Sequence, residues 1–318
     1  MLRLRVAAML WLFLLLGAAV QDGLLHGFSW AYVWVSISLA SSYVAATSLN
    51  DIADRDIDRV NHPRDSGRPL VTGEASERDL HVLHASAGAL ALAAGAAAST
   101  AALALAALSL AISVAYSMPP LRLSYRTYLV APALGVAYVL IPFSLGLVAS
   151  GASPRGSDAV LCAGLLSLFV ARINLKDFRD RVGDARYGKP TVLLRFGKDL
   201  TCLISLVALG LGELLLLGAL RPGLVLAVAL QMFVAAVASM LYVLWRTEDS
   251  RGEQVAIGIG ARMGNGLLIV LLGWLVLTGH GASGQEQVAF VLAVTALFGL
   301  SFHALATRPE QAVIGYKG

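Results

Sequence analysis

Long apolar stretches alternate with short polar segments along almost the whole chain. Most of these stretches reach the roughly 17 to 25 residues with which a helix crosses a bilayer. We therefore predict membrane-spanning helices near residues 6–20, 29–49, 80–98, 101–117, 128–149, 158–176, 200–219, 223–245, 257–279 and 286–306. The first stretch is short, and its basic start is also typical of a cleaved signal peptide. Because its cleavage site is poor, we favour a retained helix and a bundle of nine or ten spans.

The composition agrees with this pattern. Hydrophobic residues make up 58% of the 318 positions and charged residues 14%, against about 25% charged residues in soluble domains. No Pro-rich, Ser-rich or charged linker divides the chain. We therefore predict an all-α integral membrane protein that forms a single transmembrane domain over residues 1–318.

The distribution of basic residues predicts the orientation in the membrane. If the N-terminus is cytoplasmic, twenty of the twenty-four Lys and Arg residues lie in cytoplasmic segments, and the outside loops keep only Arg155 and Arg221. This asymmetry follows the positive-inside rule. It explains the net charge of +4 without a nucleic-acid partner. We expect a multi-pass protein of a bacterial or archaeal plasma membrane whose long polar loops face the cytoplasm.

Two of these cytoplasmic loops, near 50–80 and 176–199, carry aspartates at the same spacing. The members of each triad stand at relative positions 0, 3 and 7: Asp51, Asp54 and Asp58 in the first loop, and Asp177, Asp180 and Asp184 in the second. On a helix this spacing places three carboxylates on one face. Both triads continue predicted spans, so the chain is expected to carry two acidic faces at one membrane boundary.

Several ordinary explanations fit these acids less well. Solvated helix ends with surface ion pairs are common, but two identically spaced triads are not expected by chance. A calcium loop starting at Asp54 fails because Arg59 stands where the turn needs Gly. A phosphatidyl-group transferase needs a Gly where Arg55 and Arg181 stand. A cation transporter would gather its ligands near the membrane midplane, whereas these acids lie at span ends.

Facing carboxylates at a membrane boundary suit Mg²⁺, which bridges protein carboxylates to substrate phosphates. A lipid diphosphate fits this position, with its head group at the boundary and its isoprenoid tail between the helices. The metal would promote cleavage of the bond between C1 and the diphosphate oxygen. The pattern therefore favours an enzyme that uses a prenyl diphosphate.

Four motifs resemble the UbiA superfamily of intramembrane prenyltransferases. "NDIADRDID" (50–58) and "DFRDRVGD" (177–184) resemble its two Asp-rich signatures, "YSMPPLRL" (116–123) its Tyr-Ser-Pro-Pro loop, and "RPLVTG" (68–73) its Arg-Pro turn. The resemblance covers roughly residues 1 to 280. It implies a UbiA-type helical bundle whose cytoplasmic helices carry the two Asp-rich motifs.

The resemblance also implies roles for individual residues. Asn50 and the first triad would bind one Mg²⁺, the second triad another, and Asp54, Asp58, Asp180 and Asp184 would be the catalytic acids. Tyr116 would lie at the mouth of the pocket. The candidates for binding diphosphate oxygens are Arg64, Arg68, Arg122, Lys176 and Lys189. Arg172, one turn before Lys176, is either a further diphosphate ligand or a side chain that snorkels to the boundary.

The expected reaction is Mg²⁺-dependent transfer of a prenyl or polyprenyl group from its diphosphate to an aromatic or other lipid-forming acceptor. Terpene cyclisation on the same scaffold is the alternative, and it would need no acceptor. Phosphoribosyl transfer to a polyprenyl phosphate is less favoured because both triads are intact. Cation transport remains the alternative from another functional class.

Overall fold

The computed structural model describes residues 4–63 and 67–307, and within them ten helices are long and apolar enough to cross a membrane. This confirms the predicted all-helical membrane fold. The spans are formed by α1 (Leu4–Ala19) with the turn η1 (Val20–Leu25), α2 (Trp30–Ala53), α5 (Glu77–Ala98), α6 (Thr100–Ser117), α7 (Thr127–Gly135) with η3 (Val136–Leu140) and α8 (Ile141–Ala149), α9 (Gly156–Ile173), α11 (Val192–Leu220), α12 (Leu224–Arg246), α13 (Ser250–Gly279) and α14 (Gly284–Thr307).

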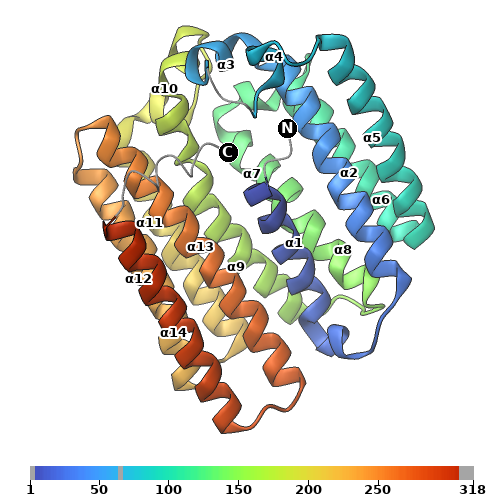
Figure 1. Cartoon of the computed structure of the whole chain (residues 1–318), viewed down its shortest axis with the longest axis vertical. Coiled ribbons are helices and arrows are strands. Elements are labelled where there is room, and N and C mark those ends of the chain that lie inside the picture. Colours follow the sequence, from blue (N-terminus) through green and yellow to red (C-terminus); the bar gives the residue numbers. More distant parts are fainter. Residues whose placement is uncertain (1–3, 64–66, 308–318) are drawn as a thin grey trace.

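Short helices lie between these spans at one end of the bundle. They are α3 (Arg55–Asn61), α4 (Pro69–Thr72) and α10 (Lys176–Arg186), with the turn η2 (Leu123–Tyr125) before α7. Figure 1 shows α3, α4 and α10 together beyond the ends of the long helices. We call α3, α4 and α10 the helical cap. The second Asp-rich segment lies in α10, and the first runs from the end of α2 into α3.

Helix α1 is built into the core rather than lying beside it. It packs closely against α8, where a Cβ on Gly17 would collide with the Phe143 carbonyl and one on Gly146 with the Leu14 carbonyl. Small residues permit such close approach between membrane helices. Leu14 and Leu16 are fully buried. Retention of this helix stays a prediction.

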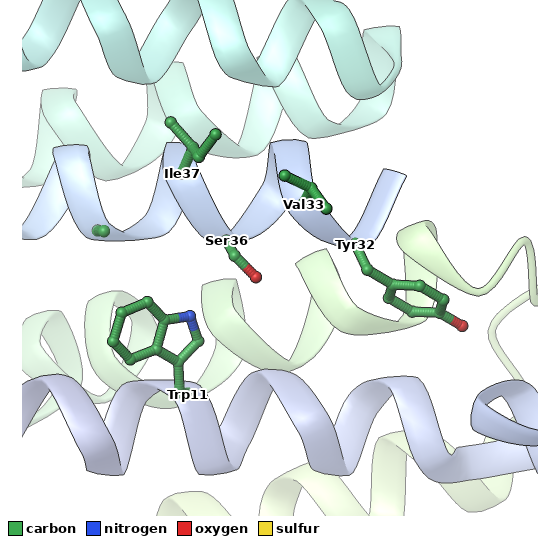
Figure 2. A pocket seen from close by; sticks show the side chains of 6 residues that line it. Trp11, Tyr32, Val33, Ser36 and Ile37 are labelled. Atoms are coloured by element: carbon green, nitrogen blue, oxygen red, sulfur yellow. The ribbon is translucent and has the colours of Figure 1, made fainter. Parts of the chain in front are cut away.

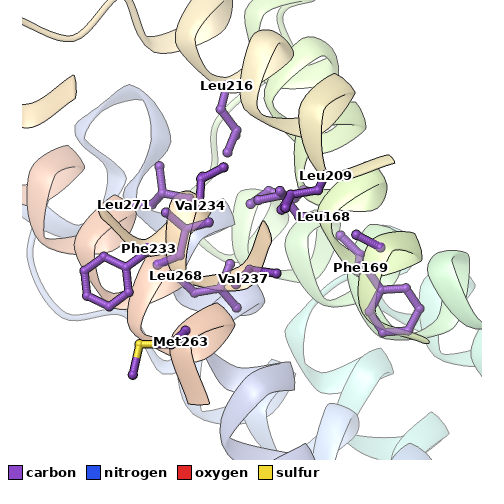
Figure 3. Packing of buried hydrophobic residues seen from close by; sticks show 14 of the residues in the cluster. Leu168, Phe169, Leu209, Leu216, Phe233, Val234, Val237, Met263, Leu268 and Leu271 are labelled. Carbon is purple, nitrogen blue, oxygen red and sulfur yellow. The ribbon is translucent and has the colours of Figure 1, made fainter. Parts of the chain in front are cut away.

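The larger hydrophobic cluster joins α9, α11, α12 and α13 (Figure 3). Figure 3 shows Leu168 of α9 near Leu209 of α11, and Phe233 of α12 near Leu268 of α13. Helix α14 packs against α12 and α13, and Phe298 meets Phe233 edge to face at a centroid distance of 5.1 Å. Phe178 of α10 also belongs to this cluster, which therefore connects the helical cap to the spans.

Local side chains explain two of the helix ends. Ser76 and Asp79 form a capping box at the start of α5, and α6 ends at Ser117, two residues before Pro119. The second triad lies on a helix, α10, as its spacing predicted, but α11 begins at Val192, earlier than the predicted start of the span near residue 200. Gly197 has a φ of 82°, which bends the first turn of α11 away from the axis of the span. An apolar pattern could not show this amphipathic start.

Candidate active site in the helical cap

The first acidic motif begins at the end of α2 and continues into α3. Asp51 lies in the last turn of α2, Asp58 lies in α3, and Asp54 stands at the junction between them. Arg68, just before α4, reaches both outer carboxylates: its Nη1 pairs with Asp51 and lies 2.7 Å from Asp58 Oδ2. All four side chains are buried. One guanidinium therefore compensates two carboxylates and ties α4 to the motif.

The middle acid of this motif has different partners. Asn50 Nδ2 donates to Asp54 Oδ2 at 3.1 Å, and Lys189 Nζ donates to the same oxygen at 3.0 Å. Lys189 follows α10, so this contact joins segments that are 135 residues apart. Asn50, predicted as part of the first metal site, thus orients a carboxylate through its amide.

The second acidic motif lies entirely within α10. Lys176 Nζ lies 2.9 Å from Asp177 Oδ1, and Arg179 Nε lies 3.0 Å from Asp180 Oδ1. Burial would lower the pKa of Lys176, but Asp177, Tyr116 and Asp180 together outweigh burial and raise that pKa. Burial would raise the pKa of Asp180, but Arg179 and His62 together outweigh burial and lower that pKa. Asp180 is therefore held as the charged partner of nearby bases.

Asp184 is the least compensated of the six acids. Burial raises its pKa to about 6, against the opposing effect of Lys189 and Lys176. Among the described residues its buried Oδ1 has no hydrogen-bond partner, and Lys189 Nζ lies 3.8 Å away. Burial would lower the pKa of Lys189, but the carboxylates of Asp54 and Asp184 contribute to raising it. Lys189 therefore stands between the two motifs.

The other predicted site residues differ in how close they lie to these acids. Tyr116 is close enough to Lys176, Lys189 and Asp54 for electrostatic interaction. The Arg122 guanidinium lies over the Tyr125 ring, 4.0 Å from its centroid. Arg64 falls outside the described residues.

Arg172 is directed toward α13. Its Nη2 donates to the Ala261 carbonyl at 2.9 Å, and its Nη1 lies 3.4 Å from Asn265 Oδ1. Neither of the two predicted roles, diphosphate contact or snorkelling, anticipated these contacts within the bundle. A part in binding the diphosphate stays a prediction for this residue.

Three residues that support the site were not predicted. Asn61 and His62, after the first triad, contact α10, and Glu253 of α13 pairs with Arg181 of α10 at 2.7 Å and with Lys198 of α11 at 2.9 Å. For His62, a polar residue four positions after the last acid of the motif was the available signal. Glu253 belongs to no recognised motif, so that no pattern in its segment pointed to it.

The donor set suits a hard divalent cation that arrives with a phosphate ligand. In residues 4–63 and 67–307, no three carboxylate, histidine or cysteine side chains converge into a ready-made cage; instead, Arg68, Lys176 and Lys189 pair with the acids. Mg²⁺ binds through one or two carboxylates plus substrate phosphates rather than in all-protein cages. Asp184 Oδ1, which accepts no hydrogen bond from the described residues, is available to such a cation. The residues therefore fit Mg²⁺ held together with a diphosphate.

A separate hollow of about 400 Å³ lies between α1 and α2. Figure 2 shows Trp11 of α1 directed toward Ser36 of α2, with Tyr32 and Val33 nearby. Its α2 residues belong to the half of that helix that is remote from Asp51. None of the residues of the acidic motifs lines it.

A multi-pass membrane bundle with a buried ionic site at one end defines the class of this protein. The sequence profile of the UbiA prenyltransferase family matches residues 9–265. The chain therefore belongs to the UbiA prenyltransferase family, and α14 lies beyond the matched region. A comparison with curated proteins finds no significant match.

Solved structures of UbiA homologues share the fold. The apo structure of a homologue from Aeropyrum pernix K1 is 22% identical, with a TM-score of 0.65 over 87% of this chain and 99% of that chain. A digeranylgeranylglyceryl phosphate synthase is 17% identical, with a TM-score of 0.63 over 85% and 93%. A homologue from Archaeoglobus fulgidus, bound to DMAPP and Mg²⁺, is 20% identical, with a TM-score of 0.60 over 84% and 98%.

Proposed function

We propose that the chain transfers a prenyl or polyprenyl group from its diphosphate to an aromatic or other lipid-forming acceptor, in a Mg²⁺-dependent reaction within the membrane. The observation that carries this proposal is the position of Lys189, whose Nζ lies 3.0 Å from Asp54 and 3.8 Å from Asp184. The ammonium group of Lys189 thus links the two acidic motifs. The acids that it contacts are carboxylates of the kind that bind a metal diphosphate.

The acids divide into two metal-binding groups in this proposal. Asn50, Asp51, Asp54 and Asp58 hold one Mg²⁺, and Asp177, Asp180 and Asp184 hold another. The bound metal supplies Lewis-acid stabilisation of the negative charge on the leaving diphosphate. Likeness to a homologue that binds DMAPP and Mg²⁺ supports this assignment.

The bases of the site bind the diphosphate. Arg68, Lys176 and Lys189 neutralise buried acids in the ligand-free protein. If Mg²⁺ pairs with those carboxylates, the same bases can bind phosphate oxygens. Arg68 would bind them in bidentate fashion and the lysines as point charges. The C1–O bond then breaks with its electron pair on the diphosphate. The acceptor forms a bond to C1 and loses a proton.

The test is turnover of a panel of prenyl diphosphates by the purified full-length chain, with and without an aromatic or glycerol-lipid acceptor. We expect a prenylated acceptor that forms with Mg²⁺ and disappears with EDTA. A cyclic hydrocarbon or alcohol formed equally without any acceptor would favour the cyclase. Metal-ion flux in vesicles without turnover would favour the transporter.

We further propose that the helical cap faces the cytoplasm of a bacterial or archaeal cell. The asymmetric distribution of basic residues supports this orientation. A cysteine at the exposed Glu74 should react with a membrane-impermeant reagent only in inverted vesicles, and one at Ser153 only in intact cells. The native Cys162 and Cys202 are buried, so that they give little background. Opposite labelling at both positions would reverse the orientation.

A further inference from the structure

Two consecutive side chains after the first acidic motif contact the helix that carries the second. Asn61 Oδ1 accepts a hydrogen bond from the Gly183 backbone N–H at 2.6 Å. His62 Nε2 lies 2.9 Å from Asp180 Oδ1. Because the carboxylate is the acceptor, Nε2 is the nitrogen that carries the hydrogen. We call these two hydrogen bonds the inter-motif contact.

The backbone of α10 is shaped for this contact. A Cβ added to Gly183 would lie 2.6 Å from Asn61 Nδ2 and 2.7 Å from Asn61 Cγ and Oδ1. Real Cβ atoms do not approach other heavy atoms so closely, so a side chain at this position would displace the Asn61 amide and break its hydrogen bond to the Gly183 N–H. Gly183 lies between Asp180 and Asp184. The close approach therefore occurs within the second motif itself.

The contact also restrains one carboxylate. Arg179 and His62 both donate to Asp180 Oδ1, at 3.0 and 2.9 Å. Arg179 belongs to the same helix as Asp180, whereas His62 belongs to the segment of the first motif. With both donors on Oδ1, the other oxygen, Oδ2, is left for a ligand. Hydrogen bonds of this kind orient metal-binding side chains and fix their charge.

We propose that Asn61 and His62 are positioning residues: Asn61 sets the spacing between α3 and α10, and His62 orients Asp180 toward the cation that arrives with the donor. The part that concerns the cation rests on the proposed function. The spacing between the helices does not depend on it. Neither residue touches the reacting atoms.

The first test measures cation binding without turnover. Mn²⁺ is titrated into the detergent-purified chain, and the free ion is followed by electron paramagnetic resonance. Loss of an outer-shell partner weakens metal affinity by roughly 10- to 100-fold, so we expect this loss in His62→Ala. His62→Gln retains an N–H near the position of Nε2 and should recover most of the affinity. His81→Ala is the matched control, since His81 is an exposed histidine at the start of α5.

A merely structural role would give another result. His62→Ala would then lower the melting temperature, while the folded fraction would bind Mn²⁺ with wild-type affinity. That outcome would overturn the role of His62, as would a failure of His62→Gln to recover affinity. In turnover assays, a positioning role should raise the Mg²⁺ concentration needed for half-maximal rate more than it lowers the rate at saturating Mg²⁺.

The second test measures the spacing alone and needs neither metal nor substrate. Spin labels on cysteines at Arg59 and Val182, both exposed, report the distance between α3 and α10. Gly183→Ala and Asn61→Ala should lengthen or broaden this distance distribution. Gly218→Ala is the control, because no atom outside its own helix backbone lies within 4 Å of a Cβ there.

The two tests separate failure of this inference from failure of the proposed function. An unchanged distance distribution in both Gly183→Ala and Asn61→Ala would overturn the spacing role. If the wild-type chain neither binds Mn²⁺ nor turns over any prenyl diphosphate, the proposed function fails together with the role of His62 toward the cation. The spacing role would still be decided by the spin-label distances.

Discussion

The two acidic motifs share one spacing but have different surroundings. In the first motif, Arg68 comes from a separate segment and compensates both Asp51 and Asp58. In the second, the bases next to Asp177 and Asp180 in sequence, Lys176 and Arg179, pair with them from the same helix, and the Oδ1 of Asp184 lacks a hydrogen bond in the described structure. The first motif is thus neutralised by tertiary contacts and the second largely by its own helix.

This difference indicates which motif depends more on a ligand. Removing one partner of a buried ion pair lowers the stability of the fold, because the other charge is left buried without compensation. A buried charge that is poorly compensated from the start destabilises the fold in the same way. The first motif is compensated by Arg68 and Lys189. The second retains a buried carboxylate, Asp184, whose pKa is raised by burial to about 6. A bound cation should therefore stabilise the second motif more than the first.

The largest expected effect on turnover comes from replacing single aspartates of the two motifs. Asp54→Asn and Asp184→Asn should each lower turnover by on the order of a hundredfold or more, because several kcal/mol of charge stabilisation are lost. Their effects on the metal-free protein should be opposite in sign. Asp54→Asn weakens the partner of Lys189, whereas Asp184→Asn removes a poorly compensated charge and should stabilise the protein by roughly 1–3 kcal/mol.

Thermal unfolding in EDTA, measured beside turnover in Mg²⁺, checks both parts. Asp56→Asn is the matched control, because Asp56 belongs to the same segment but is exposed and pairs with Arg55 and Arg59. Equal melting temperatures for the Asp54 and Asp184 variants would contradict the proposed difference in charge compensation between the two motifs. Full activity in either variant would remove its acid from the reaction.

The next largest effect is expected at Arg68. Replacement by Ala leaves Asp51 and Asp58 without this base and should cost roughly 3–5 kcal/mol in the metal-free protein. Replacement by Lys keeps the charge but loses the planar fork, so its effect should be smaller. If Arg68 also binds the donor, Arg68→Ala should raise the donor's Michaelis constant by roughly ten- to a hundredfold.

The structural and binding roles of Arg68 can be separated by adding metal. Mg²⁺ should recover much of the lost melting temperature of Arg68→Ala, because a cation can take over the two carboxylates, but it should not recover the Michaelis constant. An unchanged Michaelis constant in the folded variant would limit Arg68 to compensating the acids.

Local patterns predicted the parts of this site that depend on neighbours in sequence. The apolar stretches gave the spans, and the spacing 0, 3, 7 predicted that the acids of each triad share a face. The pairing of Lys189 with Asp54 was not predictable, because their contact depends on how α10 docks against α3. Glu253 was missed for the same reason: its partners Arg181 and Lys198 come together only after α10, α11 and α13 have packed.

A smaller effect is expected where α10 is anchored. Glu253 is buried and pairs with Arg181, which lies within the second motif, and with Lys198. Glu253→Gln should cost about 1.5–3 kcal/mol, toward the lower end because Arg181 is 44% exposed. If Glu253 holds α10 in place, turnover should fall by several-fold at limiting Mg²⁺ and recover at high Mg²⁺.

The double variant Glu253→Gln with Arg181→Gln sharpens this test. In a double-mutant cycle, two contacting residues show a coupling free energy of roughly 0.5–3 kcal/mol. Asp199→Asn is the matched control, since Asp199 follows Lys198 in α11 and accepts a hydrogen bond from Trp245 of α12. Additive effects of the two substitutions would show that the Glu253–Arg181 pair does not anchor α10.

The smallest effect on donor binding is expected at Arg172, one turn before the second motif. Its guanidinium bonds to Ala261 and Asn265 of α13. Arg172→Lys should lower the melting temperature, because the ammonium group lacks the planar fork that contacts both partners, while the donor's Michaelis constant should change by less than about twofold. Gly264→Ala tests the same contact from α13, where a Cβ would lie 2.5 Å from Arg172 Nη1. Gly260→Ala, one turn earlier on α13 with its nearest neighbour at 4.0 Å, is the control. A different result would place Arg172 among the diphosphate ligands: a Michaelis constant raised tenfold in Arg172→Lys but unchanged in Gly264→Ala. The second motif would then have one more base than its ion pairs show.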